Sequence, residues 1–339
     1  MALAAVRPGV EPARSQNAYF VMATDAHRPA WKTLVAFGII YFVWGSTFLA
    51  IRVGVREVPP FLFAAMRFSI AGLVLCLWTV ARKERLPRGR EWASAFALAT
   101  LIFVLDYGLL FWSEQRVPSG IAAVMLALIP VFMALSEIIL LRTQKLTVRL
   151  AVALLIGIAG VAVLMSRSLS LGGSPIDRAG AVALIIASMT WSIASALTRK
   201  LPLPSSKAMS SGVQMLLGGI MLALVAGVLG EFRNFHPGNV SRGVWFALLY
   251  LIVAGSIVGF TAYLWLIHHE SPTKVGTYAY VNPVVAVLVG YFLGGEALGT
   301  RTIVGTLFVL VSVVVITTTQ AKKVVATVPQ EKKADVVEA

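Results

Sequence analysis

The stretch TLVAFGIIYFVWGSTFLAI, residues 33–51, decides the fold of this chain, because it is long and apolar enough to cross a lipid bilayer. A helix needs about 20 predominantly apolar residues to span the ~30 Å of hydrocarbon. Further stretches of the 339-residue sequence meet the same requirement. The predicted spans are 33–51, 60–81, 92–112, 119–141, 147–166, 178–198, 208–229, 243–267, 274–294 and 302–320. The sequence therefore predicts an all-α polytopic membrane protein with ten transmembrane helices.

The ten predicted spans fall into two halves of five, and the second half repeats features of the first. When Trp44 is aligned with Trp191, an arginine follows eight residues later in each half. Proline lies near the middle of the fourth span, at Pro130, and of the ninth, at Pro283. Because five is odd, a second copy of the pattern must be inserted upside down. Inverted five-helix repeats of this kind typically build secondary transporters, with the substrate site at the midplane.

The predicted organisation has four parts. Residues 1–31 and 321–339 mix charged residues with prolines, and we expect both segments to be flexible tails. Residues 32–169 form the first predicted five-helix repeat, and residues 170–320 form the second. The connectors between the spans are short, which leaves no room for a sizeable soluble domain.

The net charge of +14 would indicate nucleic-acid binding in a soluble chain, but its placement gives a different answer here. The side that holds the N-terminus carries 20 of the 29 Lys and Arg residues, the opposite side carries 8, and Arg67 lies within a span. Cytoplasmic loops of membrane proteins carry such an excess of positive residues. We therefore expect an integral protein of a bacterial plasma (inner) membrane, with both termini in the cytoplasm.

Four stretches carry a resemblance to one known family: WGSTFLAIRVG (44–54), RFSIAG (67–72), VPSGIAAVMLALIPVF (117–132) and SPTKVGTYAYVNPVVAVLVGYFLGGE (271–296). Over about residues 33–320 the chain resembles the EamA-type members of the drug/metabolite transporter superfamily. The resemblance implies ten helices, two inverted repeats and a central cavity for small metabolites or drugs, usually exported. The family's acidic residue after the second proline helix is present as Glu296, whereas the equivalent first-half position is Thr143.

The two matched prolines are hinge candidates. Proline inside a helix removes one backbone hydrogen bond and kinks the helix. Pro130 would free the carbonyl of Leu126, and Pro283 would free that of Ala279. Freed carbonyls are tolerated at membrane depth where they face protein or a water-filled cavity. Packing geometry alone is the competing interpretation.

Polar and aromatic residues on three spans are candidates for the lining of the substrate cavity. Tyr278 and Asn282 lie one helical turn apart on one face of the ninth span. The sixth span offers hydroxyl groups and the first span offers aromatic rings, a combination that suits an amphipathic organic solute. Helix packing would account for the same residues. The cavity candidates are Tyr41, Trp44, Ser188, Trp191, Ser192, Tyr278 and Asn282.

Arg67 and Asp106 are deep ionisable residues within predicted spans. Arg67 lies ~10 Å, and Asp106 ~9 Å, from the outer ends of their helices at 1.5 Å per residue. A lone charge at such depth costs at least ~2.5 kcal/mol, so each should find a partner or water. We predict that the two residues pair, or share a water-filled outer vestibule. Asp106 is the strongest candidate for proton coupling, and a static structural ion pair is the alternative.

The function that the sequence favours is export of a small organic metabolite or drug, amino-acid-like or amphipathic, by alternating access. An integral membrane enzyme and a channel are the alternatives. The sequence contains no H-E-x-x-H or G-x-S-x-G motif and no stretch resembling a selectivity filter. We therefore expect no catalytic residues, metal or cofactor. The expected partners are a small-molecule substrate and the lipid bilayer, without nucleic acid. Substrate identity, coupling ion and oligomeric state stay open.

Overall fold

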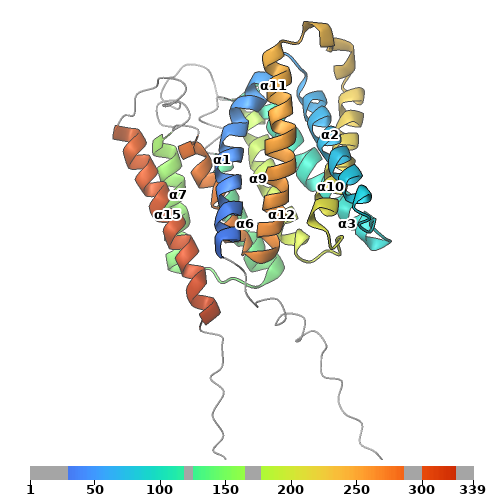
Figure 1. Ribbon diagram of the computed structural model, residues 1–339. Helices are drawn as coiled ribbons and strands as arrows, with labels where there is room; N and C mark the ends of the chain where they lie inside the picture. The colour runs from blue at the N-terminus through green and yellow to red at the C-terminus, as the bar shows by residue number, and fades with distance from the viewer. Residues whose placement is uncertain (1–29, 118–124, 165–176, 286–299, 326–339) are drawn as a thin grey trace, which may run out of the picture.

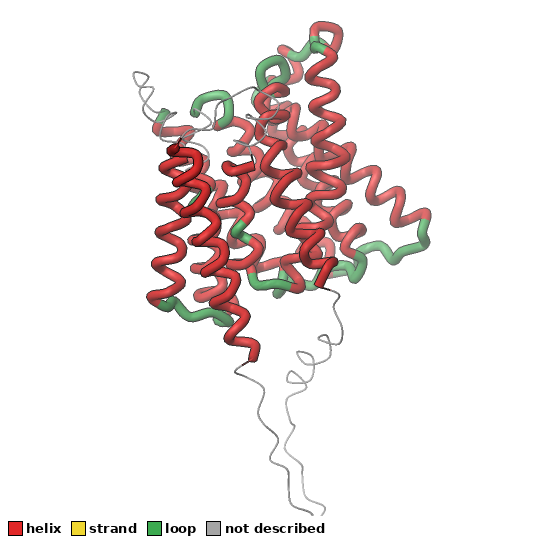
Figure 2. Tube along the Cα trace, turned by 60° about the vertical axis from the view of Figure 1, so that its left-hand side comes forward, coloured by secondary structure: helices red, strands yellow, loops and turns green. Residues whose placement is uncertain are grey.

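The computed structural model describes residues 30–117, 125–164, 177–285 and 300–325. Within these ranges the regular secondary structure is entirely helical, and the long helices lie side by side as a bundle (Figures 1 and 2). The high content of Leu, Val, Ala and Ile favours helices here, because a helix satisfies its backbone hydrogen bonds internally in a medium without water.

Two groups of helices follow one another along the chain. The first group consists of α1 (Ala30–Gly54), α2 (Pro60–Ala81), α3 (Arg90–Ala99), η1 (Thr100–Tyr107), α4 (Gly108–Ser113), α6 (Ile129–Ser136), η2 (Glu137–Leu141) and α7 (Val148–Leu164). The second group consists of α9 (Arg178–Thr198), α10 (Lys207–Val228), η3 (Glu231–Asn234), η4 (Pro237–Asn239), α11 (Arg242–Tyr250), η5 (Leu251–Val258), α12 (Gly259–His269), α13 (Pro272–Val275), the helical residues 278–285, and α15 (Thr300–Val325).

Six of the described helices are long and apolar enough to cross a membrane. They are Ala30–Gly54, Pro60–Ala81, Arg90–Ser113, Arg178–Thr198, Lys207–Val228 and Arg242–His269, and shorter apolar helices cover Ile129–Leu141, Val148–Val163 and Ile303–Thr318. The predicted span at 274–294 is described only as far as residue 285. Large apolar side chains such as Leu34, Phe42 and Leu49 on α1 are exposed on the bundle's flank, where lipid would cover them. The prediction of an all-α membrane protein is confirmed.

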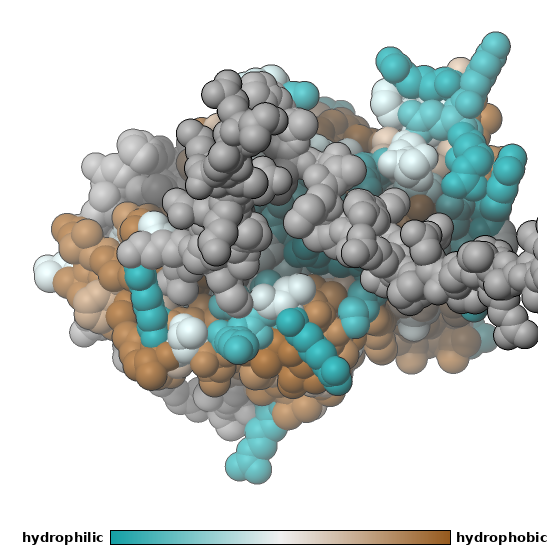
Figure 3. Space-filling model, turned by 90° about the horizontal axis from the view of Figure 1, so that it is seen from below, coloured by the Kyte–Doolittle hydropathy of each residue, from teal (hydrophilic) through white to brown (hydrophobic). Residues whose placement is uncertain are grey.

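The two ends of the bundle differ in the segments that they hold. The first residue of α1 and the last of α15 lie at one end, which is the lower end in Figure 1. The connections at 82–89, 142–147 and 199–206 lie at the same end. Seen from below, hydrophilic side chains gather on this end between hydrophobic flanks (Figure 3). We call it the basic end, after its exposed residues Arg82, Lys83, Arg85, Arg88, Arg142, Lys145, Arg149, Arg199 and Lys200.

The second helix of one group packs against the second helix of the other, and the last helix of one packs against the last of the other. α2 lies along α10, and α7 lies along α15. Glycines bring the α2 and α10 backbones together: a Cβ added to Gly72 would lie 2.4 Å from the Leu216 nitrogen, and one added to Gly219 would lie 2.4 Å from the Ser69 nitrogen. Because lipid removes the hydrophobic drive between helices, such close approach is a main source of their association.

Two of the spans change their helical pitch at matching places. The third span contains the π-helical segment η1 and the eighth contains η5, and each segment is eight residues long. π-Helical turns inside α-helices occur frequently at functional sites. Here they place Asp106 in η1, and Gly255 and Ser256 in η5, toward the buried middle of the bundle.

Candidate functional site

Three of the predicted cavity residues meet in the middle of the bundle. The ring of Trp44 on α1 lies 5.5 Å from the ring of Trp191 on α9, and 5.0 Å from that of Tyr278, as measured between ring centroids. The Trp191 and Tyr278 rings are 6.4 Å apart. All three side chains are buried, and these ring pairs meet edge to face, the arrangement that aromatic quadrupoles favour. The structure therefore brings together residues that are far apart in the sequence.

Further aromatic residues complete this group. Tyr263 on α12 lies 4.8 Å from Trp191 and 5.2 Å from Trp44, and Tyr107 lies 5.8 Å from Trp191. We call Trp44, Tyr107, Trp191, Tyr263 and Tyr278 the aromatic cluster. Sequence reasoning missed Tyr107 and Tyr263. For Tyr107 the sequence held a weak signal, because this residue directly follows Asp106, a candidate for proton coupling.

Two glycines of the eighth span make room for Trp44. The indole Nε1 of Trp44 donates a hydrogen bond of 3.0 Å to the Gly255 carbonyl oxygen. A Cβ added to Gly259 would lie 2.5 Å from that same nitrogen. Since a side chain at either position would collide with its neighbours, the Gly255-x-x-x-Gly259 spacing seats the indole against the helix backbone.

Tyr41 and Asn282 fasten α1 to the helical residues 278–285. The Tyr41 hydroxyl forms a 2.7 Å hydrogen bond with the Thr277 hydroxyl. With its amide turned to suit its neighbours, the Asn282 nitrogen donates to the carbonyl oxygens of Tyr278, at 3.0 Å, and of Tyr41, at 3.2 Å. Gly45 lets the helices approach, because an added Cβ would lie 2.9 Å from Val285. These two cavity candidates therefore hold a helix contact beside the aromatic cluster.

The serines of α9 point to backbone carbonyls. Ser188 donates to the Leu184 carbonyl at 2.9 Å, and Ser192 donates to the Ser188 carbonyl at 2.7 Å. Ser192 also lies 3.3 Å from the carbonyl oxygen of Ile129, next to Pro130. Both serines are fully buried. In this structure they lie at the contact between α9 and the fourth span. Their role in lining a substrate cavity stays a prediction.

The two prolines occupy different positions in their helices. Residues 125–126 are helical and residues 127–128 form a turn. α6 begins at Ile129, so Pro130 is its second residue and lies in the first turn. This position suits proline, whose missing N–H is not needed in the first helical turn. Pro283 lies inside the helical residues 278–285 and is buried. Their role as hinges stays a prediction.

Arg67 and Asp106 form no ion pair, although both are buried and both are among the described residues. The Arg67 guanidinium turns toward η5, where its Nε donates to the Ser256 hydroxyl at 2.8 Å. Its central carbon lies 5.3 Å from the Tyr107 ring center. Asp106 instead lies within electrostatic range of Tyr107, Tyr263 and Tyr278. The predicted pairing is therefore wrong for this structure, and a shared water-filled vestibule stays a prediction.

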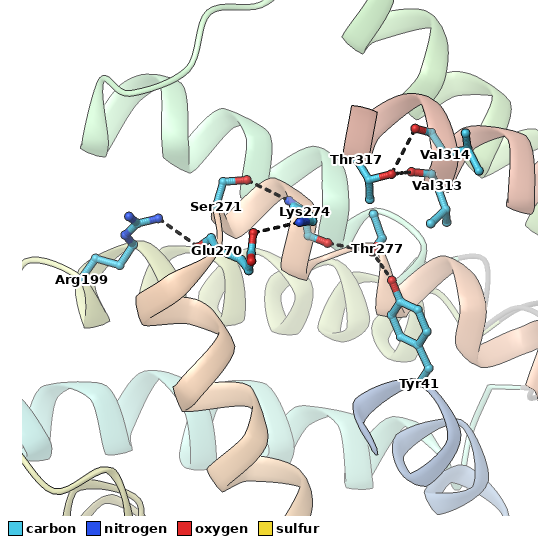
Figure 4. Close-up of polar contacts among 9 residues, drawn as sticks. All are labelled: Tyr41, Arg199, Glu270, Ser271, Lys274, Thr277, Val313, Val314 and Thr317. Atoms are coloured by element: carbon cyan, nitrogen blue, oxygen red, sulfur yellow. Dashed lines mark hydrogen bonds and ion pairs between the residues drawn. The ribbon is translucent and has the colours of Figure 1, made fainter. Parts of the chain in front are cut away.

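A polar network closes the basic end of the bundle (Figure 4). Arg199 donates to the Glu270 carbonyl oxygen at 3.1 Å, and the Lys274 ammonium pairs with the Glu270 carboxylate at 2.9 Å. Ser271 caps α13 by accepting from the Lys274 nitrogen at 3.2 Å. Thr277 donates to the Lys274 carbonyl and meets Tyr41.

The fourth span joins this closure through a buried carboxylate. Glu137 accepts hydrogen bonds from the Thr273 hydroxyl at 2.6 Å and from the Thr273 nitrogen at 3.2 Å. Together with the contacts in Figure 4, this links the segment 270–277 to α1, to Arg199 at the end of α9, and to η2. The segment 270–277 therefore ties helices of both halves together below the aromatic cluster.

Glu114, directly after α4, should give the protein's stability a pH dependence. Burial raises the pKa of this carboxyl to about 7, against an opposing effect of the Arg52 charge. Between the usual carboxyl pKa and about pH 7, the folded state keeps a proton that the unfolded chain has released. Stability should therefore fall as pH rises through this window, by at most about 3 kcal/mol.

The measurement is the melting temperature in detergent between pH 5 and 7. Glu114→Gln should reduce the decrease in melting temperature over this pH range. Glu91→Gln, at a carboxylate paired with Arg85, should leave that decrease unchanged. If the parent and Glu114→Gln give parallel curves, the buried carboxyl does not carry this dependence.

Comparisons with known proteins agree with this architecture. The sequence model of the EamA-like transporter family matches residues 31–166 and, again, residues 178–318. The inner membrane transporter YedA of Escherichia coli strain K12 is 35% identical over 302 residues, covering 87% of this chain and 95% of YedA. Protein PecM of Dickeya dadantii is 27% identical over 276 residues, covering 81% of this chain and 88% of PecM.

A solved crystal structure of a protein has a similar fold. It superposes with a TM-score of 0.67 at 22% sequence identity, covering 85% of this chain and 98% of that one. The family match includes most of both helical groups, and YedA is similar over nearly its whole length. The chain is an integral membrane protein and belongs to the EamA-like transporter family.

Proposed function

We propose that the protein is a secondary transporter that exports a small organic solute by alternating access between two inverted five-helix repeats. The repeats are residues 32–169 and 170–320. One family model matches the chain twice, once in each half, which supports an internal duplication. Inverted repeats of membrane transporters place the substrate near the midplane, at the repeat interface.

Matched helix positions support the relation between the halves. α2 and α10 are each 22 residues long and begin at Pro60 and Lys207, 147 positions apart. The π-helical segments begin at Thr100 and Leu251, 151 positions apart. Both separations are close to that between Trp44 and Trp191.

The packing pattern supports a two-fold relation as well. α1 packs on the eighth span, through α11, η5 and α12, while α9 packs on the third span, through η1 and α4. α9 also packs on α6 of the fourth span, while α1 contacts residues 277–285 of the ninth. Each contact therefore has a counterpart in which the two halves exchange roles, as a pseudo-two-fold axis requires.

The observation that carries the proposal is the composition of the aromatic cluster. Trp44 and Tyr107 come from the first half, while Trp191, Tyr263 and Tyr278 come from the second. A rocking motion of one half against the other would open and close the contacts between these rings. Aromatic faces beside a few polar groups suit an amphipathic organic solute.

The proposal also says at which end the transporter is closed in this structure, and which residue couples transport to protons. The network of Arg199, Glu270, Lys274, Thr273 and Glu137 closes the basic end, which we place in the cytoplasm. It would have to break for the solute to enter from that side. Asp106, buried beside the cluster and without an ion pair in this part of the structure, is the group that we propose for proton coupling.

The test is a panel of solutes and toxic analogues in cells that overproduce the protein. Export predicts that some compounds accumulate less than in cells with an empty vector, and that a protonophore abolishes the difference. Arg82→Met, on the exposed connection after α2, serves as a control that should behave like the parent. Unchanged accumulation across organic acids, bases and neutral amphiphiles, with the protein present in the membrane, would contradict the proposal.

A further inference from the structure

Arg67 is a cation held in a fixed position inside the bundle. Only 1% of its surface is exposed. Its Nε donates to the Ser256 hydroxyl at 2.8 Å, and its central guanidinium carbon lies 4.7 Å from the Phe68 ring center and 5.3 Å from that of Tyr107. One edge of the guanidinium is thus tethered and the side chain rests on aromatic rings, so it has little freedom to move.

The positive charge of Arg67 is not neutralised within the described part of the chain. No carboxylate there forms an ion pair with it, Asp106 included. Its Nη1 is buried and makes no hydrogen bond. Because a guanidinium cannot release its proton in a protein, and a buried unpaired charge is costly, the site favours an anion supplied from elsewhere.

The guanidinium lies beside the aromatic cluster. A Cβ added to Gly255 would lie 2.9 Å from Nη2 of Arg67. The carbonyl oxygen of the same Gly255 accepts the hydrogen bond of Trp44. The missing side chain at position 255 therefore lets the cation and the indole share one stretch of helix backbone. A bound molecule could reach both groups at once.

Three residues around this junction keep a small part of their surface accessible. Thr47, Trp44 and Tyr107 keep 6%, 5% and 9% of their surface, whereas Tyr280 and Met133 keep 0%. The Tyr107 side chain also interacts with the guanidinium, but Nη1 is left without a partner. The planar fork of arginine matches a carboxylate with parallel hydrogen bonds, which makes a carboxylate the best fit for the side on which Nη1 lies.

We infer that Arg67 anchors the carboxylate of a small organic acid whose apolar part packs against the aromatic cluster. The inference rests on the proposed transport function, and it narrows the substrate class of the same site to organic anions. Residues Arg67, Ser256 and Gly255 form the anion end of the site, and Trp44 with Tyr107 forms the beginning of its apolar part.

The test measures binding to the purified full-length protein in detergent by isothermal titration calorimetry, without any transport step. The probes are benzoate, its neutral analogue benzamide, and the cation benzylamine. The parent should bind benzoate at least ~10-fold more tightly than benzamide, as expected for a charge-assisted hydrogen-bonded contact. Arg67→Met should erase this preference, and Arg67→Lys should retain part of it. Arg82→Met removes an exposed guanidinium that also lies over a ring, that of Trp78 at 4.8 Å, and should bind like the parent.

Several outcomes would overturn the inference. They are equal affinity for the three probes, no binding of any of them, or a benzoate preference that survives in folded Arg67→Met protein. Loss of benzoate binding in Asp106→Asn as well would assign the anion site to an Arg67–Asp106 unit and not to Arg67. If Arg67→Met does not fold, as judged by gel filtration, Arg67→Lys decides: unaltered benzoate preference in that variant would contradict recognition by the guanidinium fork. Because the assay needs no transport, export of a neutral or cationic solute together with a failed benzoate test would reject the anion site and keep the proposed function.

Discussion

Gly72→Leu is expected to prevent assembly of the bundle. The Cβ of any side chain at position 72 would lie 2.4 Å from the Leu216 nitrogen and 2.8 Å from the Gly212 carbonyl oxygen. Both are backbone atoms of α10, which cannot turn away as a side chain can. Overpacking of this kind typically costs about 1–3 kcal/mol for added methylenes, and contact with rigid backbone places leucine at or above the upper end.

The measurement is the yield of monodisperse protein in gel filtration and its melting temperature. Gly38→Leu is the matched control, because Gly38 is also a helical glycine but an added Cβ meets nothing within 4 Å. Gly72→Ala should fall between the parent and Gly72→Leu. If Gly72→Leu matches Gly38→Leu in yield and melting temperature, the close packing of α2 on α10 is not a feature of the folded protein.

Trp44→Ala is expected to lower transport at least ~10-fold while leaving the protein in the membrane. The substitution removes ring contacts with Trp191, Tyr263 and Tyr278, and leaves the Gly255 carbonyl oxygen without its donor. Truncating a buried tryptophan costs about 3–5 kcal/mol in soluble cores. Here the lost contacts lie at the interface between the halves, where we propose that the solute binds.

The comparison is between uptake or efflux rates and the amount of protein in the membrane. Trp44→Phe keeps a ring but lacks the N–H, so it should retain part of the activity. Trp31→Ala, at a side chain that is 60% exposed at the start of α1, should transport like the parent. Trp44→Ala protein with normal rates would exclude the aromatic cluster from the transport path.

The sequence predicted the membrane fold well because hydrophobic length is a strong signal. All six long apolar helices of the structure overlap predicted spans. The contact between Trp44 and Trp191 was expected from the sequence, since the predicted repeat put both near the middle of the first helix of their halves. Contacts between residues at matching depths of the two halves can be anticipated in this way.

Side-chain directions could not be anticipated. Arg67 and Asp106 share a depth, but depth leaves open the rotation of each helix and the choice of partner, and Arg67 points to Ser256 and to aromatic rings. The serines of α9 bond carbonyls of their own helix, which the sequence spacing does not reveal. The third and eighth spans contain π-helical segments, whose residues do not follow the facing of a regular helix, and Tyr107 at the end of η1 lies against Trp191.

The two halves differ most clearly in how their prolines are used. The alignment paired Pro130 with Pro283, but Pro130 lies in the first turn of α6, directly after a turn, while Pro283 lies within a helix. A proline near the middle of an apolar stretch fits either arrangement, because both satisfy its lack of an N–H group. Local sequence alone could not distinguish a kink from a helix start.

The most direct test of the central claim, that the two halves are inverted copies, is the location of reporters fused along the chain. Fusions after residue 56, between α1 and α2, and after residue 204, between α9 and α10, probe equivalent connections of the two halves. The account predicts an external signal at 56 and a cytoplasmic signal at 204, together with a cytoplasmic signal after residue 85 and an external one after residue 236. Signals from the same side of the membrane at 56 and 204 would contradict it.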